Sequence, residues 1–235
     1  MAEPAVILLA RVARALGDLR ERVVFIGGAI APLLQIDPPF GGARPTTDVD
    51  AIAVTVGYSD YGRLQDELRH RGFSESLDSP HAHRWLAPGE PSTKFDLVPA
   101  GIHLGASGNE IDQAALDTSV RTELDSSLVI RHASAPGFLA LKLAAYRDRG
   151  KEDPFTSSDL EDIFALLASR RSIVAETSTA PMALRAFIVE QTKLLLESDD
   201  LEDLVAGHLA NVDRARAAEV IGVLHKTLAQ IATLA

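Results

Sequence analysis

The feature that most constrains this chain is a short apolar run that ends in two glycines and precedes, after a loop, a pair of alternating aspartates. The run covers residues 23–26 and ends at Gly27 and Gly28, and a second apolar run starts with Asp48 and Asp50. Side chains alternate across a β-strand, so both carboxylates project from the same face. Neighbouring carboxylates repel each other and stay ionised together only when a cation lies between them. The pattern therefore favours a cation site at the start of a strand.

The two glycines add a phosphate site to this cation site. They stand between an expected strand over residues 23–26 and an expected short helix over residues 29–35. Backbone N–H groups at a helix N-terminus bind phosphate. Oxygen ligands suit Mg²⁺, which usually keeps water molecules and substrate phosphates in its shell. The segment therefore predicts a phosphate chain bound beside Mg²⁺.

A third carboxylate, Asp96, lies within an apolar strand expected over residues 94–98. If that strand neighbours the strand expected over residues 48–56, Asp96 completes a three-carboxylate site for two metal ions. Such a site aligns an attacking hydroxyl with a leaving pyrophosphate. Asp96 is alternatively the base that accepts the hydroxyl proton. Both roles stay open at this point.

The remaining pattern predicts an α/β (α+β) fold with a mixed sheet, followed by a helical C-terminal domain. Amphipathic spacing indicates helices over residues 4–21 and 60–71, and β-rich runs indicate strands over residues 83–86 and 127–130. Residues 100–125 predict only a turn and one short helix. From Ala135 onward the periodicity is helical throughout. We place the domain boundary between residues 1–133 and 134–235.

The charge of the chain limits its partners. The sequence has 33 acidic residues against 23 lysines and arginines, which gives a formal charge of −10. Such a surface repels a phosphate backbone, so extended DNA binding is excluded. The absence of cysteine removes disulfides, thiolate zinc sites and a cysteine nucleophile. With no basic signal-peptide head and no apolar run of about 18 residues, we expect a cytoplasmic protein without a membrane partner.

The basic residues that are present gather in one segment, at Lys142, Arg147, Arg149 and Lys151. A cation on the first helix after the sheet can neutralise charge on transferring phosphates. The alternative interpretation is an exposed helix face whose arginines pair with neighbouring acids such as Asp148.

Two segments carry a resemblance to known proteins. The glycine pair, followed by a helix and by Arg44-x-Thr46-x-Asp48-x-Asp50, resembles the nucleotidyltransferase superfamily that includes DNA polymerase beta. The segment from Lys142 through Asp159 to Asp162 resembles the AbiEii-like branch, which includes toxins of bacterial toxin–antitoxin and phage-defence systems. Together the matches cover about residues 23–165, and the last part of the chain contributes only a helical pattern.

The resemblance implies a nucleotidyltransferase core over residues 1–133 and a helical domain that completes an active-site cleft. It implies Mg²⁺-dependent transfer of a nucleoside monophosphate from a nucleoside triphosphate to an acceptor hydroxyl. The implied acceptor is the tRNA 3′ end, and the implied protein partner is a cognate antitoxin. The implied catalytic residues are Asp48, Asp50, Asp96, Lys142 and Asp159, of which the first three bind metal. The implied nucleotide-binding residues are Gly27, Gly28, Arg44, Thr46, Lys142 and Arg147.

Two other functions fit the same residues. The acidic surface suits transfer to a cationic small molecule, as in the aminoglycoside-modifying enzymes of the same superfamily. A chain that has lost activity and acts as a regulatory partner is the second alternative, although the retained aspartate pair argues against it. Asp159 and Asp162 can also be read simply as first-turn carboxylates that stabilise a helix dipole.

Overall fold

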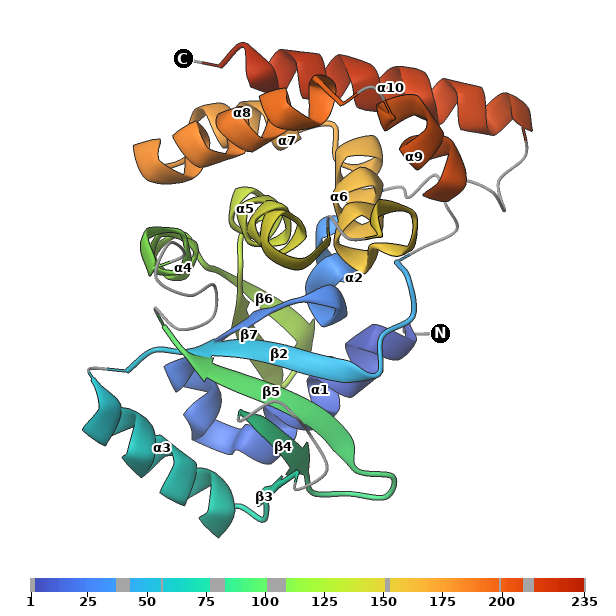
Figure 1. The fold of residues 1–235 in the computed structure, drawn as a ribbon. Helices are drawn as coiled ribbons and strands as arrows, with labels where there is room; N and C mark the ends of the chain where they lie inside the picture. The colour runs from blue at the N-terminus through green and yellow to red at the C-terminus, as the bar shows by residue number, and fades with distance from the viewer. Residues whose placement is uncertain are drawn as a thin grey trace. The chain divides into compact units, whose positions relative to one another are not determined.

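The computed structural model describes residues 3–36, 43–55, 57–76, 83–100, 109–150, 153–198, 200–208 and 214–234. It divides into two compact units, shown in Figure 1. The first comprises Met1–Pro32 and Pro45–Ala133, and the second comprises Leu33–Arg44 and Ser134–Ala235. The first unit contains a mixed sheet and the second is helical, which confirms the predicted fold class. The short helix α2 (Ala31–Leu34) lies where the chain passes from the first unit to the second.

The first unit is built on a seven-stranded sheet of order β3-β4-β5-β2-β1-β7-β6. The pairs β2–β5 and β1–β7 are parallel, and the other neighbouring pairs are antiparallel. The strands are β1 (Val23–Ile26), β2 (Asp48–Ala53), β3 (Ser74–Glu75), β4 (Arg84–Ala87), β5 (Thr93–Pro99), β6 (Val120–Asp125) and β7 (Leu128–His132). The helices are α1 (Pro4–Leu16), α3 (Tyr58–His70) and α4 (Asn109–Asp117).

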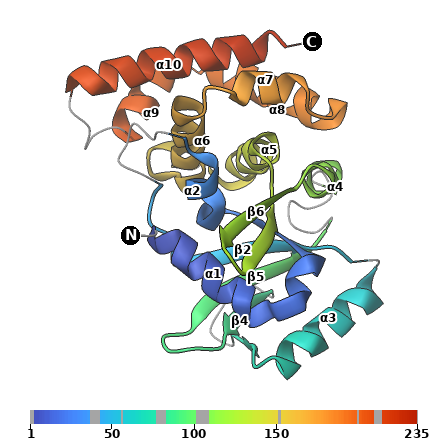
Figure 2. The same ribbon diagram turned by 180° about the vertical axis from the view of Figure 1, so that it is seen from behind.

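Helix α1 runs along one face of this sheet, as Figure 2 shows from behind. Its apolar residues recur at helical spacing, so that Leu9, Val12 and Leu16 are fully buried. The helix predicted over residues 4–21 ends early because Gly17 has φ +56°, and a 3-10 segment, η1 (Gly17–Arg22), follows.

All five predicted strands are present, with small differences at their ends. The strand predicted over residues 48–56 ends at Ala53, and the one predicted over residues 94–98 is β5. The region 100–125 contains the predicted short helix, α4, but also the unpredicted strand β6. Every residue of β6 is exposed or half-buried. A strand without a buried face does not need alternating apolar residues, and its sequence lacks the pattern by which a strand is recognised.

The second unit is a set of helices around a buried centre. The helices are α5 (Ala135–Ala145), α6 (Ser158–Ser169), α7 (Ile173–Ser178), α8 (Met182–Leu196), α9 (Leu201–His208) and α10 (Arg214–Ala232). Every residue of α5 is buried, and α5 packs against α6, α7 and α8. In Figure 1 the long helix α10 lies against α8. Among the described residues, no helix is both long and apolar enough to cross a membrane.

Candidate active site

The sheet register aligns three charged residues on neighbouring strands. Asp50 of β2 lies opposite Asp96 of β5, and Asp96 lies opposite Arg84 of β4. Strand β5 is therefore the neighbour of β2. The sequence predicted that Asp96 would join the aspartate pair if these two strands were neighbours. Asp48 and Asp50 are both half-buried, whereas Val49 between them is fully buried on the other face. The alternation expected from the sequence therefore holds.

Arg84 is the charged residue of this set that the sequence did not reveal. Its Nε donates to Asp96 Oδ1 at 2.7 Å and its Nη2 donates to Asp96 Oδ2 at 2.6 Å. The same Nη2 donates to Asp48 Oδ2 at 3.2 Å. The hydrogen bond to Asp96 raises the pKa of Arg84, burial opposes this, and the charges of Asp96, Asp48 and Asp50 add to it. Asp48 and Asp96 therefore converge on one cationic nitrogen.

Gly27 adopts a backbone conformation that only glycine tolerates at this place. Its φ is +71°, and a Cβ at this position would lie 2.1 Å from Asp50 Oδ2. The absence of a side chain thus lets the Asp50 carboxylate lie directly against the main chain of residue 27. The helix predicted over residues 29–35 is a 3-10 turn, η2 (Gly28–Ile30), continued by α2. One member of each pair, Gly27 and Asp50, is therefore in direct contact with the other.

Thr46, predicted to bind nucleotide, contacts Asp48 of the aspartate pair. Its Oγ1 donates to Asp48 Oδ1 at 2.9 Å. This bond fixes one oxygen of Asp48, while Arg84 Nη2 contacts the other. Thr46 therefore orients a carboxylate in this structure, and its predicted contact with nucleotide stays a prediction.

The carboxylates of this site offer oxygen ligands of the kind that Mg²⁺ prefers. In the part of the chain that the structure describes, no group of three or more His, Cys, Asp or Glu side chains could hold a metal ion. Asp48 and Asp96 nevertheless share one cationic atom, Arg84 Nη2. Mg²⁺ is often held by one or two carboxylates together with substrate phosphates and water. The chemistry of the carboxylates therefore fits Mg²⁺ with phosphate as a further ligand.

The helical unit holds a second cluster of charges, around Lys142 of α5. Its Nζ lies 3.0 Å from Asp159 Oδ1 and 2.6 Å from Asp162 Oδ2, both on α6. Arg44 Nε lies 3.2 Å from the other oxygen of Asp162. Burial alone lowers the pKa of Lys142, but the charges of Asp162 and Asp159 outweigh it and raise this pKa above its usual value. Two cations and two carboxylates thus balance each other in a largely buried site.

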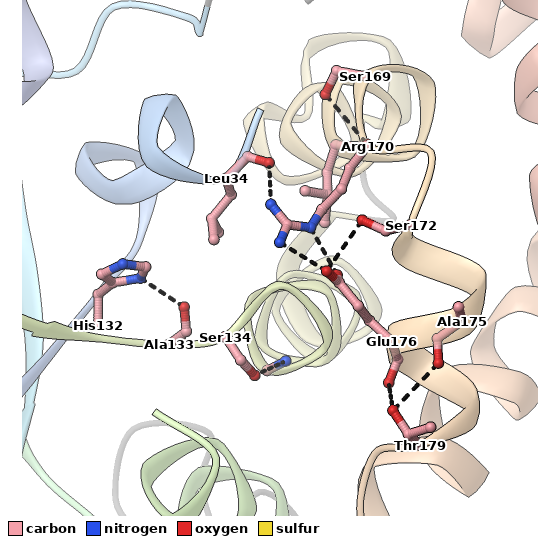
Figure 3. Close-up of polar contacts among 12 residues, drawn as sticks. Leu34, His132, Ala133, Ser134, Ser169, Arg170, Ser172, Ala175, Glu176 and Thr179 are labelled. Carbon is pink, nitrogen blue, oxygen red and sulfur yellow. Dashed lines mark hydrogen bonds and ion pairs between the residues drawn. The ribbon is translucent and has the colours of Figure 1, made fainter. Parts of the chain in front are cut away.

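The segment that includes Leu34 and Arg44 makes a second contact with the helices, between Leu34 and Arg170, which Figure 3 shows. Arg170 Nη1 donates to the main-chain oxygen of Leu34 at 2.9 Å, at the end of α2. The other nitrogens of Arg170 bind both oxygens of Glu176, at 2.7 and 2.8 Å. The hydrogen bond from Arg170 lowers the pKa of Glu176, with burial opposing it. Leu34 and Arg44 therefore each contact the helices. Residues 37–42, which lie between them in the sequence, are outside the described residues.

The basic segment after α5 is described only in part. Arg147 Nε lies 2.7 Å from Asp148 Oδ1, and its guanidinium stacks over the ring of Phe187 at 5.5 Å. This is the pairing expected of an exposed helix face. Lys151 and the side chain of Arg149 lie outside the described residues. The predicted role of Arg147 in nucleotide binding stays a prediction.

Comparison with known proteins adds little to this geometry. No family model matches the chain, and no curated protein matches it. Among solved structures, the chain is similar to an antigenic nucleotidyltransferase-like protein from Paracoccidioides brasiliensis. The two share 17% sequence identity over 95% of this chain and 94% of that chain, with a TM-score of 0.44.

Proposed function

We propose that the chain is a Mg²⁺-dependent nucleotidyltransferase that moves a nucleoside monophosphate from a nucleoside triphosphate to an acceptor hydroxyl. The observation that carries the proposal is the register of β2 and β5, which sets Asp50 beside Asp96 on the face that also bears Asp48. The contact of Gly27 with Asp50 also brings the glycine turn, which continues into the 3-10 segment η2, against the aspartate pair.

Asp48, Asp50 and Asp96 are the residues that would hold the metal, but only together with phosphate oxygens of the triphosphate, because the three carboxylates as they lie do not form a metal-binding group by themselves. When bound, Mg²⁺ neutralises phosphate charge and lowers the cost of charge on the leaving pyrophosphate. The acceptor oxygen forms a bond to the α-phosphorus, and the bond from that phosphorus to the bridging oxygen of the β-phosphate breaks. Pyrophosphate leaves with the bonding electron pair, and the hydroxyl proton passes to a base. Asp96 is the candidate base once its oxygens are released from Arg84.

The finer proposal is that the acceptor is the 3′ end of tRNA and that the chain acts as a toxin with a cognate antitoxin. Its support is the sequence resemblance from Lys142 through Asp159 to Asp162. The structure adds that these three residues form one buried ion-paired cluster. A role of the helical domain in completing the active-site cleft stays a prediction of the sequence.

The metal-site test replaces Asp50 by asparagine, which keeps the size of the side chain and removes its charge. We expect labelled nucleotide transfer to fall by roughly two orders of magnitude, because a ligand of the cation is lost. The matched control is Asp66→Asn, which removes the same charge from an exposed ion pair on α3. Asp66→Asn should retain full transfer. Equal activity of Asp50→Asn and wild type contradicts the proposal.

The acceptor test incubates wild-type protein with each labelled nucleoside triphosphate and with either total tRNA or a set of aminoglycosides. We expect label at the tRNA 3′ end and none on the small molecules. Label on aminoglycosides alone would replace the tRNA acceptor by the small-molecule alternative. Mg²⁺-dependent triphosphate binding without transfer to any acceptor would favour the regulatory module.

A further inference from the structure

We propose that the guanidinium of Arg84 is a counter-cation that competes with free Mg²⁺ for Asp48 and Asp96. It is displaced from these carboxylates when Mg²⁺ binds together with a nucleoside triphosphate. The inference rests on the proposed function and assigns to Arg84 a positioning role that neither the sequence nor the comparisons indicated. It predicts that metal and triphosphate bind cooperatively, and that Arg84 is one cause of this cooperativity.

While Arg84 is paired with Asp96, its hydrogen bonds engage both of the carboxylate oxygens that a metal ion would use. Both oxygens of Asp96 accept hydrogen bonds from the guanidinium, at 2.7 and 2.6 Å. This two-point arrangement is the strongest form of the arginine–carboxylate pair. Mg²⁺ at the same carboxylate therefore has to displace at least one charge-assisted hydrogen bond.

Arg84 also reaches the second carboxylate. Its Nη2 lies 3.2 Å from Asp48 Oδ2, so one guanidinium neutralises part of the charge on two strands. The side chains of Arg84 and Asp96 are only 17% and 18% exposed, which limits screening by water. Loss of Arg84 without a replacement cation leaves carboxylates facing one another, which is costly. The guanidinium is therefore released only when other positive charge takes its place.

A triphosphate changes this balance in two ways. It brings Mg²⁺ with phosphate oxygens already in its shell, so fewer protein ligands are required. It also offers the released guanidinium a new partner, because arginine binds phosphate through two parallel hydrogen bonds as it binds carboxylate. Free Mg²⁺ supplies positive charge, but neither the phosphate ligands nor a new partner for the guanidinium. The chain should therefore bind Mg²⁺ better in the presence of a triphosphate than alone.

The experiment measures Mg²⁺ binding to the full chain by calorimetry, alone and with a non-hydrolysable nucleoside triphosphate analogue. The test variant is Arg84→Gln, which removes the charge and the two-point pairing. The matched control is Arg69→Gln, which removes the same charge from an exposed arginine that pairs with Asp66 and Glu75. Arg84→Lys keeps the charge without the two-point pairing, and circular dichroism checks that each variant is folded.

We expect Arg84→Gln to bind free Mg²⁺ about tenfold or more tightly than wild type, the scale of one charge-assisted hydrogen bond. The gain in Mg²⁺ affinity on adding the analogue should shrink in this variant. Arg69→Gln should match wild type, and Arg84→Lys should fall between wild type and Arg84→Gln. If Arg84→Gln does not fold, the intermediate gain in Arg84→Lys tests the same competition.

The possible failures are distinguishable. Unchanged or weaker Mg²⁺ binding by folded Arg84→Gln or Arg84→Lys overturns the role of Arg84. The proposed function still stands in that case if the wild-type protein binds Mg²⁺ together with the analogue. Absence of Mg²⁺ binding in every variant, with and without the analogue, overturns both.

Discussion

At the residue scale, position 27 excludes any side chain for two independent reasons. Its φ of +71° is strained for every residue except glycine, and a Cβ would lie 2.1 Å from Asp50 Oδ2. We expect Gly27→Ala to lower the free energy of unfolding by about 1–3 kcal/mol, the usual cost of such a backbone conformation. It should also weaken Mg²⁺-dependent triphosphate binding, because Asp50 has to move.

The measurement is urea unfolding of both variants, with Gly62→Ala as the control. Gly62 lies within helix α3, and a Cβ there meets no atom within 4 Å. Alanine at this helical position should raise stability slightly, by about 0.5–1 kcal/mol. Wild-type stability in Gly27→Ala would show that the turn relaxes without cost and that its contact with Asp50 is not required.

Lys142 shows how a residue-level resemblance and a structure can assign different partners to one side chain. The resemblance assigns it to phosphate, whereas the structure gives it Asp159 and Asp162. A buried ammonium group with two carboxylates leaves those carboxylates uncompensated if it moves. A phosphate contact therefore requires another cation near the carboxylates, and Arg44 already supplies one at Asp162.

At the element scale, helix α3 is fastened to the sheet by a buried tyrosine. Tyr61 Oη donates to the main-chain oxygen of Leu97 on β5 at 2.5 Å. Burial raises the pKa of Tyr61 from 10.0 to about 12. Because the neutral form is favoured in the folded state, its stabilising contribution is full below pH 10.0 and is lost as the pH rises towards about 12.

We therefore expect Tyr61→Phe to reduce the loss of stability between about pH 9 and about pH 11. At neutral pH the same variant should be less stable than wild type by about 1 kcal/mol, the net value of one hydrogen bond. Urea unfolding at both pH values measures these differences. Tyr58→Phe is the control, since Tyr58 belongs to the same helix but is 81% exposed. If Tyr61→Phe and wild type lost the same free energy of unfolding at alkaline pH, the titrating group would be a residue other than Tyr61.

The sequence predicted elements well where an apolar pattern was present. The strand over residues 23–26 follows from a run of apolar residues, all of them buried, and the strand bearing Asp96 follows from apolar residues among which every second position is buried. The exposed strand β6 and the two-residue strand β3 carry no such pattern and were not predicted. The site was predicted through Gly27, Asp48 and Asp50, because glycine pairs and alternating carboxylates are visible within one segment.

Arg84 could not be predicted in the same way, because its relation to Asp96 is a register between strands. A charged residue at the start of an apolar strand is a weak signal taken alone. Only the pairing of Arg84 with Asp96, and of Asp96 with Asp50, brings the three to one level of the sheet. The register depends on how whole strands bury their apolar faces, which a local motif does not report.

At the scale of the whole molecule, the formal charge of −10 limits how a nucleic acid can bind. Each neutralised phosphate of B-DNA contributes about −0.9 to the slope of log affinity against log salt. We expect no saturable binding of a labelled duplex at about 0.15 M salt, because an acidic surface cannot neutralise a long backbone. A tRNA that presents only its 3′ end should bind with a shallow slope, between about −1 and −3. Fluorescence anisotropy across a salt series measures both. A steep slope for tRNA, or tight duplex binding, would mean that the basic residues form a larger nucleic-acid surface than one nucleotide and the tip of one RNA require.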